Sequence, residues 1–161
     1  MQYTATATSS EHFEVTAETG APAGSLDYAS WLRTSAQITT ADGIVYDIAP
    51  SGFWRTGRLI TRDGCSFAEL KPDFSRGAYL SFANGISLHF KTRSFWNNSR
   101  FIVLDGNGDE IAAVQYYFEW RRFRYRYDIS LHNAMADRET AAMLPVLLLY
   151  CARLVHQRKA T

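Results

Sequence analysis

The sequence predicts a mainly β fold: a closed antiparallel meander barrel of about 11–12 strands that encloses a hydrophobic C-terminal helix. Two observations predict it. Turn dipeptides recur every 21 residues, and the last apolar segment, AAMLPVLLLYCA (141–152), has no polar face. We expect a single domain over residues 1–161, with strands between about residues 2 and 131 and the central helix at about 138–158.

The N-terminal strands are predicted by alternation alone. Tyr3, Ala5 and Ala7 alternate with threonines, and Phe13 and Val15 begin a second alternating run. Successive side chains of a strand point to opposite faces, so such runs have one apolar face.

From residue 42 onward the strands follow the repeat. Asp-Gly and Asn-Gly are strong signals for type I′ hairpin turns, and aromatic residues recur half-way between them. Each unit therefore fits a β-hairpin with two strands of six or seven residues. The turn pairs begin at Asp42, Asp63, Asn84 and Asp105, and the aromatic residues are Phe53, Phe74, Phe95 and Tyr116.

The final element is an apolar helix that is short for a membrane span. Residues 141–152 would extend roughly 18 Å, against about 30 Å of bilayer hydrocarbon. Many twisted strands curl and close, and a barrel of that width needs more than its own side chains to fill it. We expect the helix to be this filling, with Cys151 in it and Cys65 in a strand as reduced core thiols.

Three segments carry a resemblance to a known family: FIVLDGNGDEIAAVQYYF (101–118), RFRYRYDI (122–129) and DRETAAMLPVLLLYCARLV (137–155). A strand leading into D-x-x-G-x, a polar-aromatic strand and a final apolar helix resemble the tubby-like superfamily, which includes phospholipid scramblases and plant LURP-one-related proteins. The resemblance implies a helix threading the barrel, and it implies binding of phosphoinositides. It assigns no binding residue to this chain.

A meander places the glycine turns at one end of the barrel and the intervening turns at the other. The charges separate accordingly, and the second end is basic and aromatic. Arg122, Arg124 and Arg126 extend this charge along one strand face, and we expect the intervening Phe123, Tyr125 and Tyr127 to point inward.

This basic end is the candidate site, because arginine forks suit phosphate and tryptophan suits a membrane interface. The expected function is a non-catalytic binding or adaptor module for anionic phospholipid or phosphoinositide headgroups, or for an acidic protein surface. The alternative is a structural or protein–protein interaction module with no ligand, in which the arginines form cross-strand pairs. The candidate anion- or lipid-binding residues are Arg122, Arg124, Arg126, Arg93, Arg100, Arg55, Trp54, Trp96 and Trp120.

Other chemistry finds little support in the sequence. The four histidines lack metal-ligand spacing, and no P-loop, GxSxG or GxGxxG motif occurs. We therefore expect no catalytic residue, metal or cofactor, and an enzyme is the third hypothesis. The net charge of +1 argues against nucleic acid as a partner. No signal-peptide or membrane-spanning pattern is evident, so a cytoplasmic location, including the periphery of a membrane, is expected.

Overall fold

The computed structural model describes residues 1–29, 35–52, 56–73, 77–92, 100–132 and 137–159. Within these ranges twelve strands precede one helix, in agreement with the predicted 11–12 strands and C-terminal helix. The strands are β1 (Gln2–Ala7), β2 (His12–Ala17), β3 (Pro22–Tyr28), β4 (Ala36–Thr40), β5 (Val45–Ser51), β6 (Gly57–Arg62), β7 (Cys65–Pro72), β8 (Ala78–Phe82), β9 (Ser87–Thr92), β10 (Arg100–Leu104), β11 (Glu110–Glu119) and β12 (Arg124–Leu131), and the helix is α1 (Arg138–Lys159).

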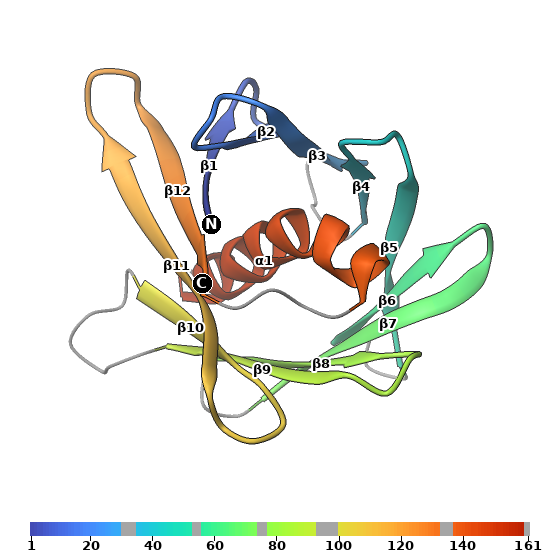
Figure 1. Cartoon of the computed structure of the whole chain (residues 1–161). Coiled ribbons are helices and arrows are strands. Elements are labelled where there is room, and N and C mark those ends of the chain that lie inside the picture. Colours follow the sequence, from blue (N-terminus) through green and yellow to red (C-terminus); the bar gives the residue numbers. More distant parts are fainter. Residues whose placement is uncertain (30–34, 53–55, 74–76, 93–99, 133–136, 160–161) are drawn as a thin grey trace.

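The strands form a closed antiparallel barrel. Each strand pairs with the next along the chain, and β1 closes the ring by pairing with β12, where Tyr3 lies opposite Ile129. Figure 1 shows the ring of strands around α1. The predicted closed meander is confirmed, and closure leaves no strand edge exposed.

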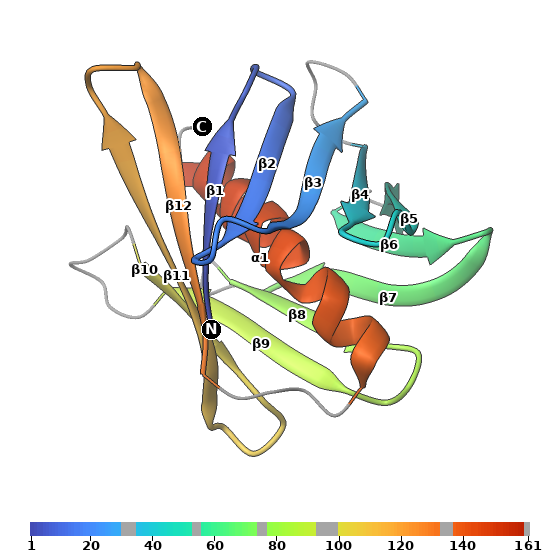
Figure 2. The same ribbon diagram turned by 45° about the horizontal axis from the view of Figure 1, so that its top comes forward.

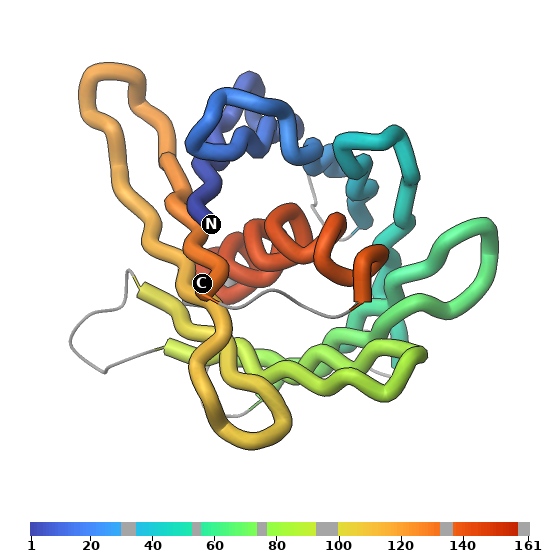
Figure 3. Tube along the Cα trace, viewed as in Figure 1, coloured from blue at the N-terminus to red at the C-terminus, as the bar shows by residue number. Residues whose placement is uncertain are grey.

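The interior is filled by the alternating apolar residues and by the helix. Tyr46, Ile48, Leu88 and Phe90 point inward and are buried. Every residue of α1 from Met143 to Val155 is also buried. The trace in Figure 3 encircles the helix, so α1 is the central filling that the sequence predicted.

By length and hydropathy alone, residues 138–157 could also cross a membrane. Of the most apolar part of this segment, 78% is buried within the protein. The barrel already supplies the apolar surroundings that a helix without a polar face requires.

The helix lies closest to β3 and β4 and also contacts β12 and β11; Figure 2 shows α1 running past β3. Gly24 of β3 permits this approach: a Cβ atom there would lie 2.8 Å from Cγ2 of Val146 and 2.6 Å from the carbonyl oxygen of Thr39. Any side chain at position 24 would therefore push the helix away from the sheet.

The expectation of type I′ turns holds at only one of the four glycine turns. Both Asp63 and Gly64 have positive φ, as this turn requires. At the other three, only a glycine has positive φ, and its N–H donates to the carbonyl oxygen three residues earlier. These three loops are one residue longer than the two-residue loop of a type I′ hairpin. The extra residue allows an ordinary turn followed by one glycine in the left-handed conformation. In the fourth turn this glycine is Gly108 and not Gly106.

Two predicted orientations are wrong. Phe123 does not point into the barrel, because it belongs to the β11–β12 turn and is 78% exposed. Cys65 is exposed at the start of β7, next to the two-residue turn, whereas Cys151 is buried in α1. Alternation does not predict orientation at these positions because each lies at the boundary of a turn.

The two ends of the barrel differ, and α1 connects them. The helix starts at the end with the glycine turns, where Asp137 caps it by accepting the N–H of Thr140 over 2.9 Å. It runs toward the other end, where the β1–β2 and β11–β12 turns lie. The last turns of α1 therefore face the basic end.

Candidate anion-binding site

A pocket of about 560 Å³ opens at the basic end of the barrel. The β1–β2 turn forms one wall, the β11–β12 turn forms another, and α1 contributes one arginine. Three arginines and no Asp or Glu belong to the lining. The lining residues are Ala7, Thr8, Ser9, Ser10, Phe13, Arg122, Phe123, Arg124, Tyr125 and Arg153.

Arg153 is the buried cation of this pocket, with 6% of the residue exposed. Its Nε donates to the hydroxyl oxygen of Tyr28 over 3.1 Å, and one terminal nitrogen donates to that of Tyr127 over 3.4 Å. The guanidinium carbon lies 4.1 Å from the centre of the Phe13 ring and 5.3 Å from that of Tyr28. Arg153 is thus held in place by aromatic rings and neutral hydroxyls.

No carboxylate of the described residues lies within 4.0 Å of Arg153, and the sequence between the described ranges contains no Asp or Glu. Burial raises the pKa of Tyr127 to about 12, so this hydroxyl is neutral at physiological pH. A buried charge without a counterion costs stability, unlike a paired one. Among the described residues, the buried positive charge of Arg153 therefore has no carboxylate partner.

The polar wall of the pocket comes from the β1–β2 turn. The hydroxyl of Ser9 accepts the N–H of His12 over 3.1 Å, and the N–H of Thr8 donates to the carbonyl oxygen of His12 over 3.0 Å. These bonds close the turn and place the hydroxyl residues Thr8, Ser9 and Ser10 along one side of the pocket. Hydroxyls beside a cation are suitable donors to phosphate oxygens.

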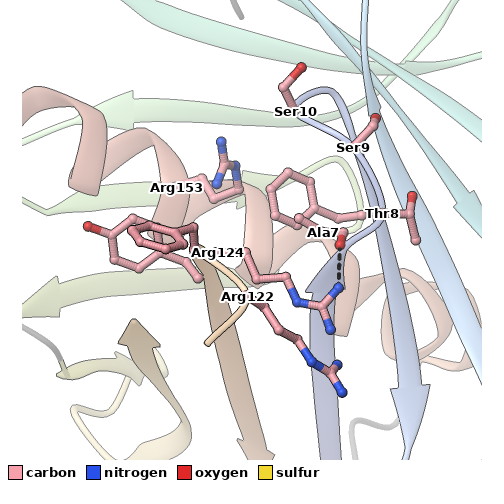
Figure 4. Close-up of a pocket in the computed structure, with 10 residues that line it drawn as sticks. Ala7, Thr8, Ser9, Ser10, Arg122, Arg124 and Arg153 are labelled. Carbon is pink, nitrogen blue, oxygen red and sulfur yellow. Dashed lines mark hydrogen bonds between the residues drawn. The ribbon is translucent and has the colours of Figure 1, made fainter. Parts of the chain in front are cut away.

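Arg122 and Arg124 also line the pocket and are partly engaged by the protein. The Nε atoms of both lie near Oε2 of Glu119, at 4.0 Å and 3.7 Å, and Arg124 also donates to the carbonyl oxygen of Ala7 over 3.0 Å. Arg122 keeps 65% of its side chain exposed, against 28% for Arg124. In Figure 4, Arg122 and Arg124 extend in a common direction, and the guanidinium group of Arg153 lies apart from theirs.

The other predicted site residues divide into two groups. Arg126 lies outside the pocket, on the outer face, where it pairs with Asp128 over 3.2 Å and lies over the Tyr117 ring. Arg100 begins β10 and Trp120 is exposed in the β11–β12 turn, and neither lines the pocket. The remaining predicted residues lie outside the described part of the chain: Arg55, Arg93, Trp54 and Trp96.

A second pocket, of about 580 Å³, lies at the opposite end and has a different charge balance. Arg62 and Arg138 line it together with Asp42 and Glu139. Arg62 forms an ion pair with Glu139, which also accepts the Tyr46 hydroxyl over 2.9 Å. Its charges are thus balanced within the pocket, so the pocket at the basic end is the better anion site.

The site residues that sequence reasoning missed are Arg153, Phe13 and the β1–β2 turn. In the sequence, Arg153 is the charged residue that directly follows the apolar segment 141–152. A charged residue in a helix that is otherwise apolar on all sides must be buried or emerge at an end, and this was the available signal. That β1 and α1 meet at the same pocket follows from ring closure by β1 and β12.

The side chains of the pocket can bind and orient an anion. Within the described ranges, no group of three or more His, Cys, Asp or Glu side chains is placed to hold a metal ion. The pocket offers cations, hydroxyls and aromatic rings, which bind and orient an anion. None of its lining residues is a histidine or carboxylate.

No protein-family model matches the chain, and neither the curated proteins nor the solved structures that were compared with it give a match. The resemblance to the tubby-like superfamily therefore stays a prediction from the sequence pattern. The site has to be interpreted from its own geometry.

Proposed function

We propose that this protein is a non-catalytic binding module whose pocket at the basic end binds a phosphate-bearing anionic headgroup, with phosphoinositides as the favoured class. The observation that carries the proposal is Arg153, a buried guanidinium without a carboxylate partner among the described residues, in a pocket lined by Arg122 and Arg124. A bound anion would supply the missing countercharge. Guanidinium groups bind phosphate through two parallel hydrogen bonds.

The test is binding to phosphatidylcholine vesicles with and without a phosphatidylinositol bisphosphate, measured by co-sedimentation at low and at physiological salt. We expect binding that requires the phosphoinositide and weakens as salt rises. The double variant Arg122→Ala/Arg153→Met should bind at least about tenfold more weakly, provided that its melting curve remains cooperative.

The control is Arg138→Ala, which removes one positive charge from an exposed residue at the opposite end of the barrel, as the single variant Arg122→Ala does at the basic end. This variant should bind vesicles as the wild-type protein does. Equal weakening by Arg138→Ala would mean that net charge, and not this pocket, directs binding.

A free phosphate compound offers the same chemistry as a lipid headgroup. Calorimetric titration with soluble inositol 1,4,5-trisphosphate separates the two sources. Binding of the soluble compound without binding to vesicles would identify a free metabolite as the ligand class. Absence of binding in both assays at low salt would overturn the proposal.

One observation favours the alternative of a structural or protein-interaction module. Glu119 lies within 4.0 Å of Arg122, Arg124 and Arg126, so one carboxylate engages three of the six predicted arginines. These ion pairs lie where the β11–β12 hairpin turns, next to the backbone pair Glu119–Arg124. If neither vesicles nor soluble headgroup bind, closure of the barrel end is the role that remains for these arginines.

A further inference from the structure

The β11–β12 turn, residues 120–123, combines exposed aromatic and cationic side chains. Trp120 is 73% exposed and Phe123 is 78% exposed, the two most exposed aromatic residues in the described part of the chain. Arg121 and Arg122, also exposed, lie between them. Large aromatic side chains beside arginines are typical of segments at the boundary of an anionic bilayer.

The conformation of this turn is fixed and strained. Phe123 has φ of +49°, in the left-handed region that bulky residues rarely occupy. Phe118 supports the turn from below: its ring lies 4.7 Å from Trp120 and 6.3 Å from Phe123, both edge to face. Backbone strain of this kind concentrates at functional segments, and the exposed ring of Phe123 is available to a partner outside the folded chain.

The turn is also placed for contact with a large surface. It lies at the tip of the hairpin of β11, the longest strand at 10 residues, and β12. Figures 1 and 2 show this hairpin splaying away from the axis of α1. Arg122 and Phe123 belong to the turn and also line the anion pocket, so a surface that contacts the turn meets the mouth of the pocket.

We propose that the β11–β12 turn inserts Trp120 and Phe123 into the interfacial region of an anionic bilayer, so that the pocket takes its headgroup from the membrane. This inference rests on the proposed function, since the pocket supplies the specific contact and the turn supplies the membrane contact. The ligand is then a headgroup of a membrane lipid, because Arg121 and Arg122, between the two aromatic residues, complement an anionic membrane surface.

The test separates the two contributions by measuring two ligands. The variant Trp120→Ser should bind phosphoinositide vesicles at least about tenfold more weakly than wild type, yet bind soluble inositol 1,4,5-trisphosphate within about twofold, because Trp120 does not line the pocket. Arg153→Met should weaken both. The control is Tyr79→Ser, which removes an exposed aromatic residue from the outer face of β8 and should change neither.

A second readout follows insertion directly. Tryptophan fluorescence of the wild-type protein should be quenched by vesicles containing brominated lipid, and Trp120→Phe should lose most of that quenching. If wild type binds the soluble headgroup but Trp120→Ser keeps full vesicle affinity, membrane insertion is wrong and the pocket proposal stands. If wild type binds no headgroup at all, while its tryptophans are still quenched, the pocket proposal fails and insertion stands. If neither signal is seen, both proposals fail, and the exposed aromatic residues of the turn would instead bind an apolar recess on a protein partner.

Discussion

The Nε of Arg153 donates to the hydroxyl oxygen of Tyr28 over 3.1 Å and joins the end of α1 to β3, 125 residues earlier in the chain. The same arginine lines the pocket at the basic end. If Arg153 is a structural anchor, its replacement should lower the stability of the fold. If Arg153 binds a ligand, its replacement should lower the affinity for that ligand.

Arg153→Met should separate them. Methionine keeps the length and apolar contacts of the arginine stem and removes a buried charge that lacks a carboxylate, so the free energy of unfolding should stay within about 1 kcal/mol of wild type or rise. Affinity for soluble inositol phosphate should fall at least about tenfold. Urea denaturation and calorimetric titration measure the two effects. A loss of about 3 kcal/mol or more in stability would instead make Arg153 a structural anchor.

Phe123→Gly should stabilise the fold while weakening membrane binding. Glycine relieves the left-handed backbone at φ +49°, which costs an L-residue roughly 1–2 kcal/mol. Part of this gain is offset by the greater freedom of glycine in the unfolded chain. We expect a net gain of up to about 1 kcal/mol in urea denaturation, with weaker vesicle co-sedimentation. A destabilised variant would show that the Phe118–Phe123 contact outweighs the strain.

Leu148→Asp tests the helix as the core of the barrel. Leu148 is completely buried in α1, and an unpaired buried carboxylate costs several kcal/mol, comparable with the whole stability of a domain. Circular dichroism should show no cooperative melting of this variant. The control is Leu148→Met, which conserves volume and should cost less than about 1.5 kcal/mol. A folded Leu148→Asp protein would contradict the central position of α1.

The pH dependence of stability should include a contribution from His12. Hydrogen bonds to Glu14 and then to Asp27 raise the pKa of His12 above its ordinary value of 6.5. The charged pairs are fully formed below about pH 6.5, and their stabilisation is lost as pH rises through the higher folded pKa. His12→Gln should therefore show a flatter dependence of the unfolding midpoint on pH in this range. Unchanged curvature would mean that other groups dominate.

The barrel was predictable from the sequence because its signals are periodic. Turn pairs every 21 residues, alternation such as that around Leu88, and the apolar run from Met143 define strands and helix by local rules. Details that depend on loop length were not predictable in this way. One extra loop residue changed the turn type at three of the four glycine turns. Phe123 lies in a turn, and its side chain is exposed where alternation predicted that it points inward.

The site was predictable only at the level of the barrel end. Charge separation between the two sets of turns located the basic end, and Arg122 and Arg124 do line its pocket. Pairing partners are a tertiary property, so the sequence pattern did not show that Glu119 engages these arginines or that Arg126 pairs with Asp128. The role of Arg153 depends on the registry of α1 within the barrel, which no local pattern encodes.

The most direct test of the central claim is an NMR titration that follows the arginine Nε–Hε resonances while soluble inositol 1,4,5-trisphosphate is added. The ligand pocket predicts saturable shifts of the Arg153 and Arg122 signals, with Arg62 and Arg138 at the opposite end unchanged. Shifts confined to Arg62 and Arg138, or no saturable shift at any arginine, would contradict an anion site at the basic end of the barrel.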